Sequence, residues 1–416
     1  MFQDFLSAFQ GFAQTFARSG KKVYLVGGAV RNRLLGYPVG DFDFTTNATP
    51  QEVMKLFPRV LPTGIQHGTV TVLYQGQGLE VTTFRVDGKY SNARHPDQVS
   101  YTGSLEEDLL RRDFTINALA LDLETGDLID ITGGRSDLEQ KVLRAIGQAE
   151  TRFREDALRM LRLFRFASQL GFTIETQTLA AVSLCREDLG KLSRERVRDE
   201  VVKTLLAPFP ARSWAAWQNE NLLPWIFPSL QKAEFSSTVL VQFEGLPSHL
   251  RLPFLRSVFL LDQGLLRTPF LDWDEELRAL CFSNQDRAIQ VKILTLIAAA
   301  TNEASTEVAV KKALFQWGSR ELPVHFEQIW QALAHVFPRK ADQWQAWGQA
   351  LNRIVVSTDP LFLKDLTISG NELIGLGIPA GPTLGKILSQ LLAAVWEKPT
   401  LNEKQTLRQL CQTLER

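Results

Sequence analysis

Cysteine is scarce in this chain. Only three of the 416 residues are cysteines, at positions 185, 281 and 411, and no CxxC pair is present. Zinc sites and disulfide frameworks need closely spaced or paired cysteines, so the sequence points to neither. We expect all three thiols to be buried in the fold.

Long apolar runs are also lacking. The longest, around residues 293–300, is far shorter than the roughly 20 residues that cross a bilayer. The N-terminal sequence MFQDFLSAFQ has an acid at position 4 and no cationic segment before its apolar residues, which predicts an amphipathic helix and not a signal peptide. We therefore expect a cytoplasmic protein with no membrane partner.

The chain carries no net charge. Its 46 basic and 46 acidic residues balance, which by itself argues weakly against a nucleic-acid partner. The distribution matters more, because the segment from Lys141 to Lys203 contains 13 basic and 9 acidic residues. A neutral protein can bind phosphates through such a local excess.

The pattern of residues divides the chain into two parts. Residues 1–150 are typical of an α/β fold, and their order of strands and helices predicts a small mixed sheet with helices on one face. The second predicted helix begins with Thr49 as N-cap and Pro50 at the first helical position. Strands are predicted at 23–26, 42–46, 69–74, 79–84 and 117–122, and helices at 29–35 and 49–57. From about residue 151 helical periodicity runs to the end, with breaks at 207–210, 245–247, 357–360 and 378–382.

A glycine pair lies between the first predicted strand and the first predicted helix. Gly27 and Gly28 would let the backbone come close to a ligand, and the helix start offers free N–H groups to a phosphate. Arg31 would add a fixed positive charge there. Most glycine pairs are only turns, so this pattern needs support from other motifs.

Paired carboxylates follow the glycine pair. Asp41 and Asp43 are spaced so that both would project from the same face of a strand, and Glu80 on another predicted strand could be a third acid. Mg²⁺ prefers one or two carboxylates together with substrate phosphates. An isolated DxD pair is more often a solvated surface feature.

Read together, five motifs resemble those of a known family. They occupy residues 27–45, 107–118, 130–138, 154–166 and 193–200, and they include GGxVR, GDxDxxT and RRDFTINA. The first is similar to the signature of the nucleotidyltransferase superfamily that includes DNA polymerase β. The whole series, with residues 366–382 near the end, resembles the bacterial class II CCA-adding enzymes of the tRNA nucleotidyltransferase and poly(A) polymerase family. No histidine is followed by Asp, so the resemblance is to the Bacillus-type members without a His-Asp domain.

This resemblance implies a fold and an activity. The fold would be an α+β head of the DNA polymerase β-like type, followed by an all-α neck, body and tail. The expected divisions are 1–140 for the head, 141–205 for the neck, 206–300 for the body and 301–416 for a tRNA-binding tail. The activity would be template-independent addition of C, C and A to the 3′ end of tRNA from CTP and ATP, releasing pyrophosphate, with Mg²⁺ as cofactor.

The resemblance also implies roles for individual residues. Asp41, Asp43 and Glu80 would be catalytic, with Asp41 and Asp43 as metal ligands. Asp156 and Arg159 would act as an amino-acid template that accepts cytosine or adenine, while Glu195 and Arg196 would brace the helix that carries this template. The other residues expected to bind the nucleotide are Gly28, Arg31, Arg112, Arg162 and Arg165.

Helical geometry agrees with the template role. At 100° per residue, Arg159 and Arg162 point away from an apolar side of the predicted helix, and Asp156 lies beside Arg159 as an i, i+3 pair. That apolar side would consist of Ala157, Met160, Leu161, Phe164 and Ser168. By itself such a pair would be an ordinary surface ion pair.

Two departures from the family pattern keep alternatives open. Asn32 stands where many members carry Asp, and Asn92 stands where Asp is common in the loop at 90–97. That loop argues against an enzyme that adds only CC, but a specialist for A or CC shares every motif. A bacterial poly(A) polymerase would usually carry a basic C-terminal extension, which this sequence lacks. A non-catalytic RNA-binding module could lose the paired acids, yet both are present.

Overall fold

The chain forms two compact units, residues 1–232 and 233–416, which are considered separately. The computed structural model describes residues 2–87, 99–228, 244–246, 251, 271–302, 305–320 and 328–414. Within these residues, no helix is both long enough and apolar enough to cross a membrane.

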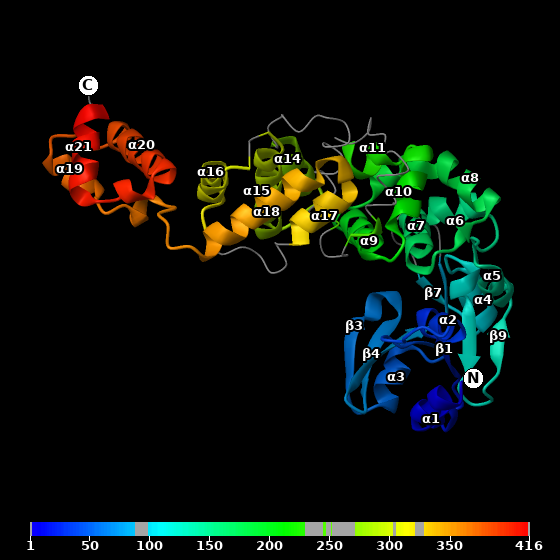
Figure 1. Ribbon diagram of the computed structural model, residues 1–416. Coiled ribbons are helices and arrows are strands. Elements are labelled where there is room, and N and C mark those ends of the chain that lie inside the picture. Colours follow the sequence, from blue (N-terminus) through cyan, green and yellow to red (C-terminus); the bar gives the residue numbers. More distant parts are fainter. Residues whose placement is uncertain are drawn as a thin grey trace. The chain divides into compact units, whose positions relative to one another are not determined.

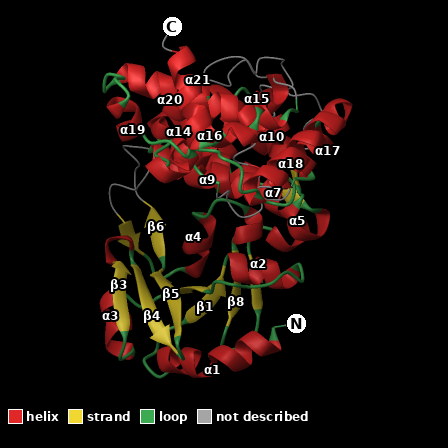
Figure 2. Cartoon of the chain, turned by 60° about the vertical axis from the view of Figure 1, so that its left-hand side comes forward, coloured by secondary structure: helices red, strands yellow, loops and turns green. Residues whose placement is uncertain are grey.

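A seven-stranded mixed sheet forms the centre of the first unit (Figures 1 and 2). Its order is β3-β4-β5-β2-β1-β8-β9, and β2 pairs with β5 in parallel while the other neighbours are antiparallel. The strands are β1 (Val23–Val26), β2 (Asp43–Thr46), β3 (Val60–Gly64), β4 (Thr69–Tyr74), β5 (Gln77–Thr83), β8 (Leu119–Asp122) and β9 (Leu128–Asp130). The five predicted strands are confirmed with shifts at their ends, whereas β3 and β9 were not predicted.

Two short ladders lie outside this sheet. One pairs β6 (Arg85–Asp87) with β7 (Val99–Tyr101), and the other pairs β10 (Val142–Leu143) with β11 (Thr173–Ile174). These strands have two or three residues each, too few to show an alternating pattern in the sequence.

Helices cover both faces of the sheet, so the expectation of helices on one face is wrong. On one face, Phe9 and Phe12 of α1 (Gln3–Ala17) pack on Phe44 of β2, with ring centroids 5.1 and 4.9 Å apart. On the other, Tyr24 and Leu109 belong to one buried cluster, and Leu109 comes from α4 (Leu105–Leu110). All four residues of β1 are buried, and a strand that is apolar on both sides needs a layer on each.

Local helix signals in the first unit are confirmed. Thr49 caps α3 (Pro50–Leu56) with a reciprocal capping box to Glu52. The first predicted helix is α2 (Gly28–Leu34), which starts directly after the glycine turn. These signals involve residues within one turn of each other, which is why the sequence reveals them.

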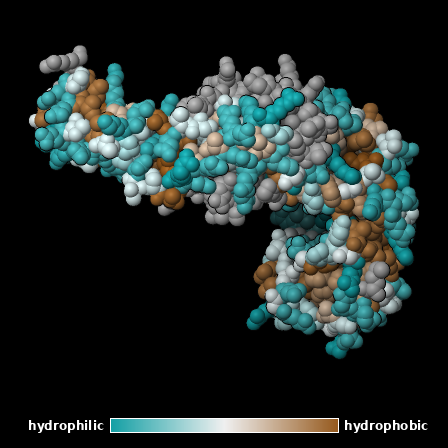
Figure 3. All heavy atoms as spheres, viewed as in Figure 1, coloured by the Kyte–Doolittle hydropathy of each residue, from teal (hydrophilic) through white to brown (hydrophobic). Residues whose placement is uncertain are grey.

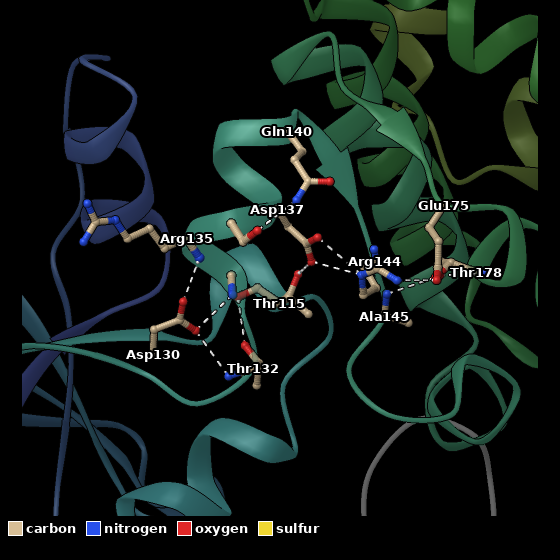
Figure 4. A network of polar contacts seen from close by, with 12 residues as sticks. Thr115, Asp130, Thr132, Arg135, Asp137, Gln140, Arg144, Ala145, Glu175 and Thr178 are labelled. Atoms are coloured by element: carbon tan, nitrogen blue, oxygen red, sulfur yellow. Dashed lines mark hydrogen bonds and ion pairs between the residues drawn. The ribbon is translucent and has the colours of Figure 1, made fainter.

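A polar network fastens the head to the helices that follow (Figure 4). Arg144 forms ion pairs with Asp137 of α5 (Gly134–Gln140), at 3.2 Å, and with Glu175. Thr115 also donates to Asp137, at 2.6 Å. Glu175 caps α8 (Thr176–Cys185), so one arginine joins α5 of the head to the helices that follow it. The other helices of this unit after α5 are α6 (Ala149–Glu155), α7 (Leu158–Leu170), α9 (Arg194–Leu206), α10 (Pro210–Asn219) and α11 (Leu223–Ile226).

Helices make up the described part of the second unit. They are α14 (Leu271–Ala279), α15 (Asn284–Asn302), α16 (Glu307–Trp317), α17 (Gln328–Val336), α18 (Ala341–Val356), α19 (Gly370–Gly375), α20 (Pro382–Glu397) and α21 (Lys404–Leu414). The last three share a core that includes Leu373, Leu391 and Leu407. Hydrophilic residues cover much of their visible surface in Figure 3.

Most of the predicted breaks are confirmed. Residues 207–209 separate α9 from α10, and 357–360 follow α18. Pro382 begins α20, as expected of proline at a helix start. For the break at 245–247, Pro247 lies outside the described residues.

The cysteines follow the expectation in two cases of three. Cys185 and Cys411 are buried, but Cys281 is exposed, so the expectation for Cys281 is wrong. Cys281 lies in the turn after α14 and has a positive φ of 58°. Turns that connect helices run over the protein surface, so a side chain in such a turn is commonly exposed.

Candidate active site

The three predicted acids line one pocket of the first unit, and together they are called the acidic corner. Asp43, the first residue of β2, is the register partner of Glu80 on β5, so their side chains project from the same face of the sheet. Asp41 lies just before β2 and outside the predicted strand at 42–46, so the expectation that both aspartates project from the face of one strand is wrong for Asp41. Phe42, which lies between the two aspartates in the sequence, packs on Phe9 of α1 with ring centroids 4.9 Å apart and so anchors the segment that leads into β2.

The negative charges of these three acids repel each other, and a bound cation would relieve that repulsion. Desolvation and the Glu80 and Asp41 carboxylates raise the pKa of Asp43, while Arg112 lowers it. Among the described residues, no three acidic, histidine or cysteine side chains form a metal-binding cluster. A cation held by two carboxylates and by phosphate oxygens fits this corner, which is the mode that Mg²⁺ prefers.

The glycine turn brings the backbone close to Arg112. Gly27 has φ +67° and ψ −129°, in the left-handed region that favours glycine, and a Cβ on it would lie 3.6 Å from the guanidinium of Arg112. Gly28 then opens α2, the helix that carries Arg31.

All of the nucleotide-binding residues expected from the sequence line one pocket. It measures about 410 Å³, within the range of small-molecule sites. The predicted residues that line it are Gly28, Arg31, Arg112, Asp156, Arg159, Arg162 and Arg165. Asp43 lines this pocket and also the adjoining one, which contains Asp41 and Glu80. The acidic corner and the arginine-lined pocket, whose arginines form its basic wall, therefore share Asp43.

Buried carboxylates hold three arginines of the basic wall. Arg112 pairs with Asp108 at 3.1 Å, Arg162 with Asp113 at 2.6 Å, and Arg165 with Glu200 at 2.5 Å. Burial would raise the pKa of Asp113, but Arg162 and the Asn117 amide hold that pKa well below its usual range. The three carboxylates therefore orient the guanidinium groups of these arginines before any ligand arrives.

Arg31 is held differently, by neutral groups. It is 8% exposed and donates to the amide oxygens of Asn117 and Asn32, at 2.6 and 2.8 Å. Burial lowers the pKa of Arg31 to about 10, with Asp113 opposing the shift and Arg165 and Arg162 adding to it. Arg31 stays protonated at neutral pH, and its charge is available to a phosphate.

The predicted template residues do not pair with each other, so the expected i, i+3 pair is wrong. α6 ends at Glu155 and α7 begins at Leu158, and Asp156 between them is extended. Asp156 accepts from the Leu158 backbone N–H at 3.1 Å and from Arg196 at 3.0 Å. Aspartate favours such capping positions over helix interiors, which explains the break.

Arg159 has its own set of partners. It pairs with Glu155 at 2.7 Å and donates to the Arg111 carbonyl at 3.0 Å. Arg196 does contact Asp156, as a bracing role requires. The predicted apolar side is also confirmed, because Ala157, Met160, Leu161, Phe164 and Ser168 are all buried.

Comparison with known proteins agrees with this architecture. Three family models match the chain: the poly A polymerase head domain at residues 23–144, the RNA and SrmB- binding site of polymerase A at 171–234, and tRNA nucleotidyltransferase domain 2 at 265–411. The CCA-adding enzyme of Lactobacillus johnsonii is 37% identical over 385 residues, covering 91% of this chain and 90% of the relative. That of Lactiplantibacillus plantarum is 37% identical over 402 residues, covering 95% and 93%.

The chain belongs to the family of CCA-adding enzymes. A crystal structure of the Bacillus stearothermophilus CCA-adding enzyme in complex with CTP has a TM-score of 0.73 and 32% identity, and covers 100% of this chain and 98% of that one. The chain is therefore an enzyme, a nucleotidyltransferase whose head has the DNA polymerase β-like fold, as predicted.

Some residues of the pocket carry no role predicted from the sequence. Asp113, Asn117 and Phe166 line the nucleotide pocket but received no predicted role. Asp113 and Asn117 lie inside the RRDFTINA motif and Phe166 ends the motif at 154–166, so a position within a motif is a usable signal for all three. Glu155, the partner of Arg159, also went without a role. The loop at 90–97 lies outside the described residues.

Proposed function

We propose that this chain completes the 3′-CCA end of tRNA, adding C, C and A from CTP and ATP without a nucleic-acid template and releasing pyrophosphate. One observation carries the proposal: Asp43 is shared by a basic pocket, large enough for a nucleotide, and by the corner that holds Asp41 and Glu80. Membership in the CCA-adding family points to the same activity.

Asp41 and Asp43 would hold Mg²⁺, with Glu80 completing the acidic corner. When bound, the cation neutralises the charge that develops on the reacting phosphate and activates the attacking 3′-OH. Arg31 and Arg112 bind the triphosphate from the opposite side, and the Gly28 backbone lets it come close. Such transfer needs mainly positioning and charge neutralisation, which these side chains supply.

Base selection would come from Asp156 and Arg159. Cytosine and adenine each present an amino donor beside a ring-nitrogen acceptor, while guanine and uracil present an oxygen acceptor beside an N–H donor. A carboxylate beside a guanidinium matches the first pattern and opposes the second. Arg196 and Glu155 restrain the two side chains, and Arg162 and Arg165 complete the wall.

The substrate tRNA would be bound through its backbone, by shape more than by sequence. The divisions proposed for this task are a head at 1–140, a neck at 141–205, a body at 206–300 and a tRNA-binding tail at 301–416. We place the reaction in the cytoplasm.

The direct test is extension of tRNA that lacks CCA, with CTP, ATP and Mg²⁺. We expect three nucleotides to be added in the order C, C, A. Addition that stops after CC, or that occurs only on tRNA ending in CC, would assign the chain to a specialist. A long tail of A would assign it to the poly(A) polymerases. No incorporation of any nucleotide would contradict the proposal.

A further inference from the structure

One aromatic ring lies at the centre of three guanidinium groups in the nucleotide pocket. Phe166 has Arg165 at 4.2 Å, Arg31 at 5.0 Å and Arg162 at 5.4 Å, measured from each guanidinium carbon to the ring centroid. All three distances are within the roughly 6 Å over which an aromatic ring attracts a cation. Arg31 comes from α2 of the head, whereas Arg162, Arg165 and the ring itself come from α7.

Three like charges around one point repel each other unless something compensates them. Asp113 offsets Arg162 and Glu200 offsets Arg165, each through a close ion pair. Arg31 has the amide oxygens of Asn117 and Asn32 instead. The electron-rich ring is therefore an important source of attraction that draws Arg31 toward the two arginines of α7.

The ring is itself held in a fixed orientation. Phe166 is 4% exposed, and Phe114 packs against it edge to face, with centroids 5.8 Å apart and an interplanar angle of 83°. Phe114 immediately precedes η2 (Thr115–Asn117), the short segment that carries Asn117. The same piece of the head thus positions the ring and the amide that binds Arg31.

We infer that Phe166 is a positioning residue for the incoming nucleotide. Its ring gathers Arg31, Arg162 and Arg165 before the nucleotide arrives, so that CTP or ATP meets cations that are already in place. This inference rests on the proposed function, because it assigns the ring a task in that same pocket.

An ordinary core role for Phe166 makes a different prediction. A core ring acts through its volume, which fluorination changes little. Attraction to a cation depends on the electron density of the ring face, which each added fluorine withdraws. Replacing Phe166 by fluorinated phenylalanines therefore separates the two roles at nearly constant shape.

The experiment introduces mono-, tri- and pentafluorophenylalanine at position 166 of the full chain by site-specific incorporation. CTP affinity is measured by calorimetry without tRNA, and KM and kcat are then measured for CTP with tRNA. The matched control carries pentafluorophenylalanine at Phe164, a fully buried ring of α7 outside the residues that line the pocket. Thermal unfolding of every variant shows whether the fold is retained.

We expect CTP affinity to fall stepwise along the series, reaching about tenfold with five fluorines, since attraction by a buried ring is of that order. The KM for CTP should rise in parallel, while the KM for tRNA and the kcat change little. Equal CTP affinity across the series, or an equal loss in the Phe164 control, would overturn the inference alone. A wild-type chain that binds no CTP would overturn the inference and the proposed function together.

Discussion

The two sides of Asp43 are built in opposite ways. On one side, Asp41, Asp43 and Glu80 are exposed on or beside the sheet and repel each other. On the other, Arg112, Arg162 and Arg165 come from helices or from the turn after one, and each is oriented by a buried or largely buried carboxylate. We therefore propose that the acidic side takes a cation from solution, whereas the protein itself neutralises and orients the basic side.

This difference separates two tasks in one pocket. Exposed carboxylates on a sheet can gain and lose a hydrated cation easily, because no buried charge is left behind when it departs. Buried ion pairs hold side chains in fixed positions, and losing one partner is costly. We expect changes on the acidic side to stop chemistry while sparing the fold, and changes on the basic side to affect stability and nucleotide recognition.

The largest effect is expected on the acidic side. Replacing Asp41 or Asp43 by Ala would remove a proposed ligand for the cation, and we expect turnover to fall by at least about 10³-fold, because metal catalysis supplies several kcal/mol. Folding should change little, since both side chains are exposed. Turnover with Mg²⁺ and the melting temperature check this, with the exposed Asp127→Asn as the control. Wild-type turnover in either variant would refute the metal assignment.

The next effect is on stability, from the basic side. Asp113→Asn leaves Arg162 without its carboxylate, and we expect unfolding to become easier by roughly 3 kcal/mol. The pKa of Asp113 is lower in the folded chain than in the unfolded one. Its contribution is therefore present above the unfolded value of about 3.9 and is lost as pH falls through the folded value.

Melting temperatures of the wild type and of Asp113→Asn between pH 7 and pH 3 test this sign. The gap between them should be widest at neutral pH and should narrow below about pH 4. A gap that stays constant, or that widens on acidification, would show that the charge of Asp113 contributes nothing to the fold.

Base selection should show a smaller effect. Arg159→Ala would remove the proposed hydrogen bonds to the base, worth about 1.5–3 kcal/mol, which is roughly a tenfold to hundredfold change in preference. We expect poorer use of CTP and ATP and a narrower advantage over UTP and GTP, with some transfer remaining. The measurement is kcat/KM for all four nucleotides, on tRNA that ends before CCA and on tRNA that ends in CC. Arg154→Ala, an exposed arginine nearby, is the matched control.

An unchanged CTP-to-UTP ratio in Arg159→Ala would place selection elsewhere. In that case the contacts of Arg159 with Glu155 and with the Arg111 carbonyl would be its whole task, which is to tie α7 to the head.

The features that could be predicted from the sequence are those set by residues close together in the chain. The Thr49 cap, the glycine turn and the spacing of Asp41 and Asp43 each depend on a few neighbouring residues, and all were recognisable. The two-sided packing of β1 was misjudged, because its short apolar run does not show how many faces are covered.

The partners within the site were beyond the reach of such patterns. Arg31 and Asn117 are 86 positions apart, and Arg196 lies 40 positions from Asp156. Only the fold brings them together, so no periodicity records the contact. Helical geometry suggested that Asp156 and Arg159 pair with each other. Instead, Asp156 accepts hydrogen bonds from Arg196 and from the Leu158 backbone N–H at the start of α7.

We expect the basic side of the pocket to bind a nucleotide without metal, and the acidic side to act only with a bound cation. Calorimetric titration of CTP into the wild type and Asp43→Asn, each in EDTA and in Mg²⁺, followed by tRNA extension under the same conditions, separates these two sides. Both proteins should bind CTP in EDTA with similar affinity, while only the wild type with Mg²⁺ should extend tRNA. CTP binding that appears only with the divalent cation, or that is lost in Asp43→Asn, would contradict this expectation.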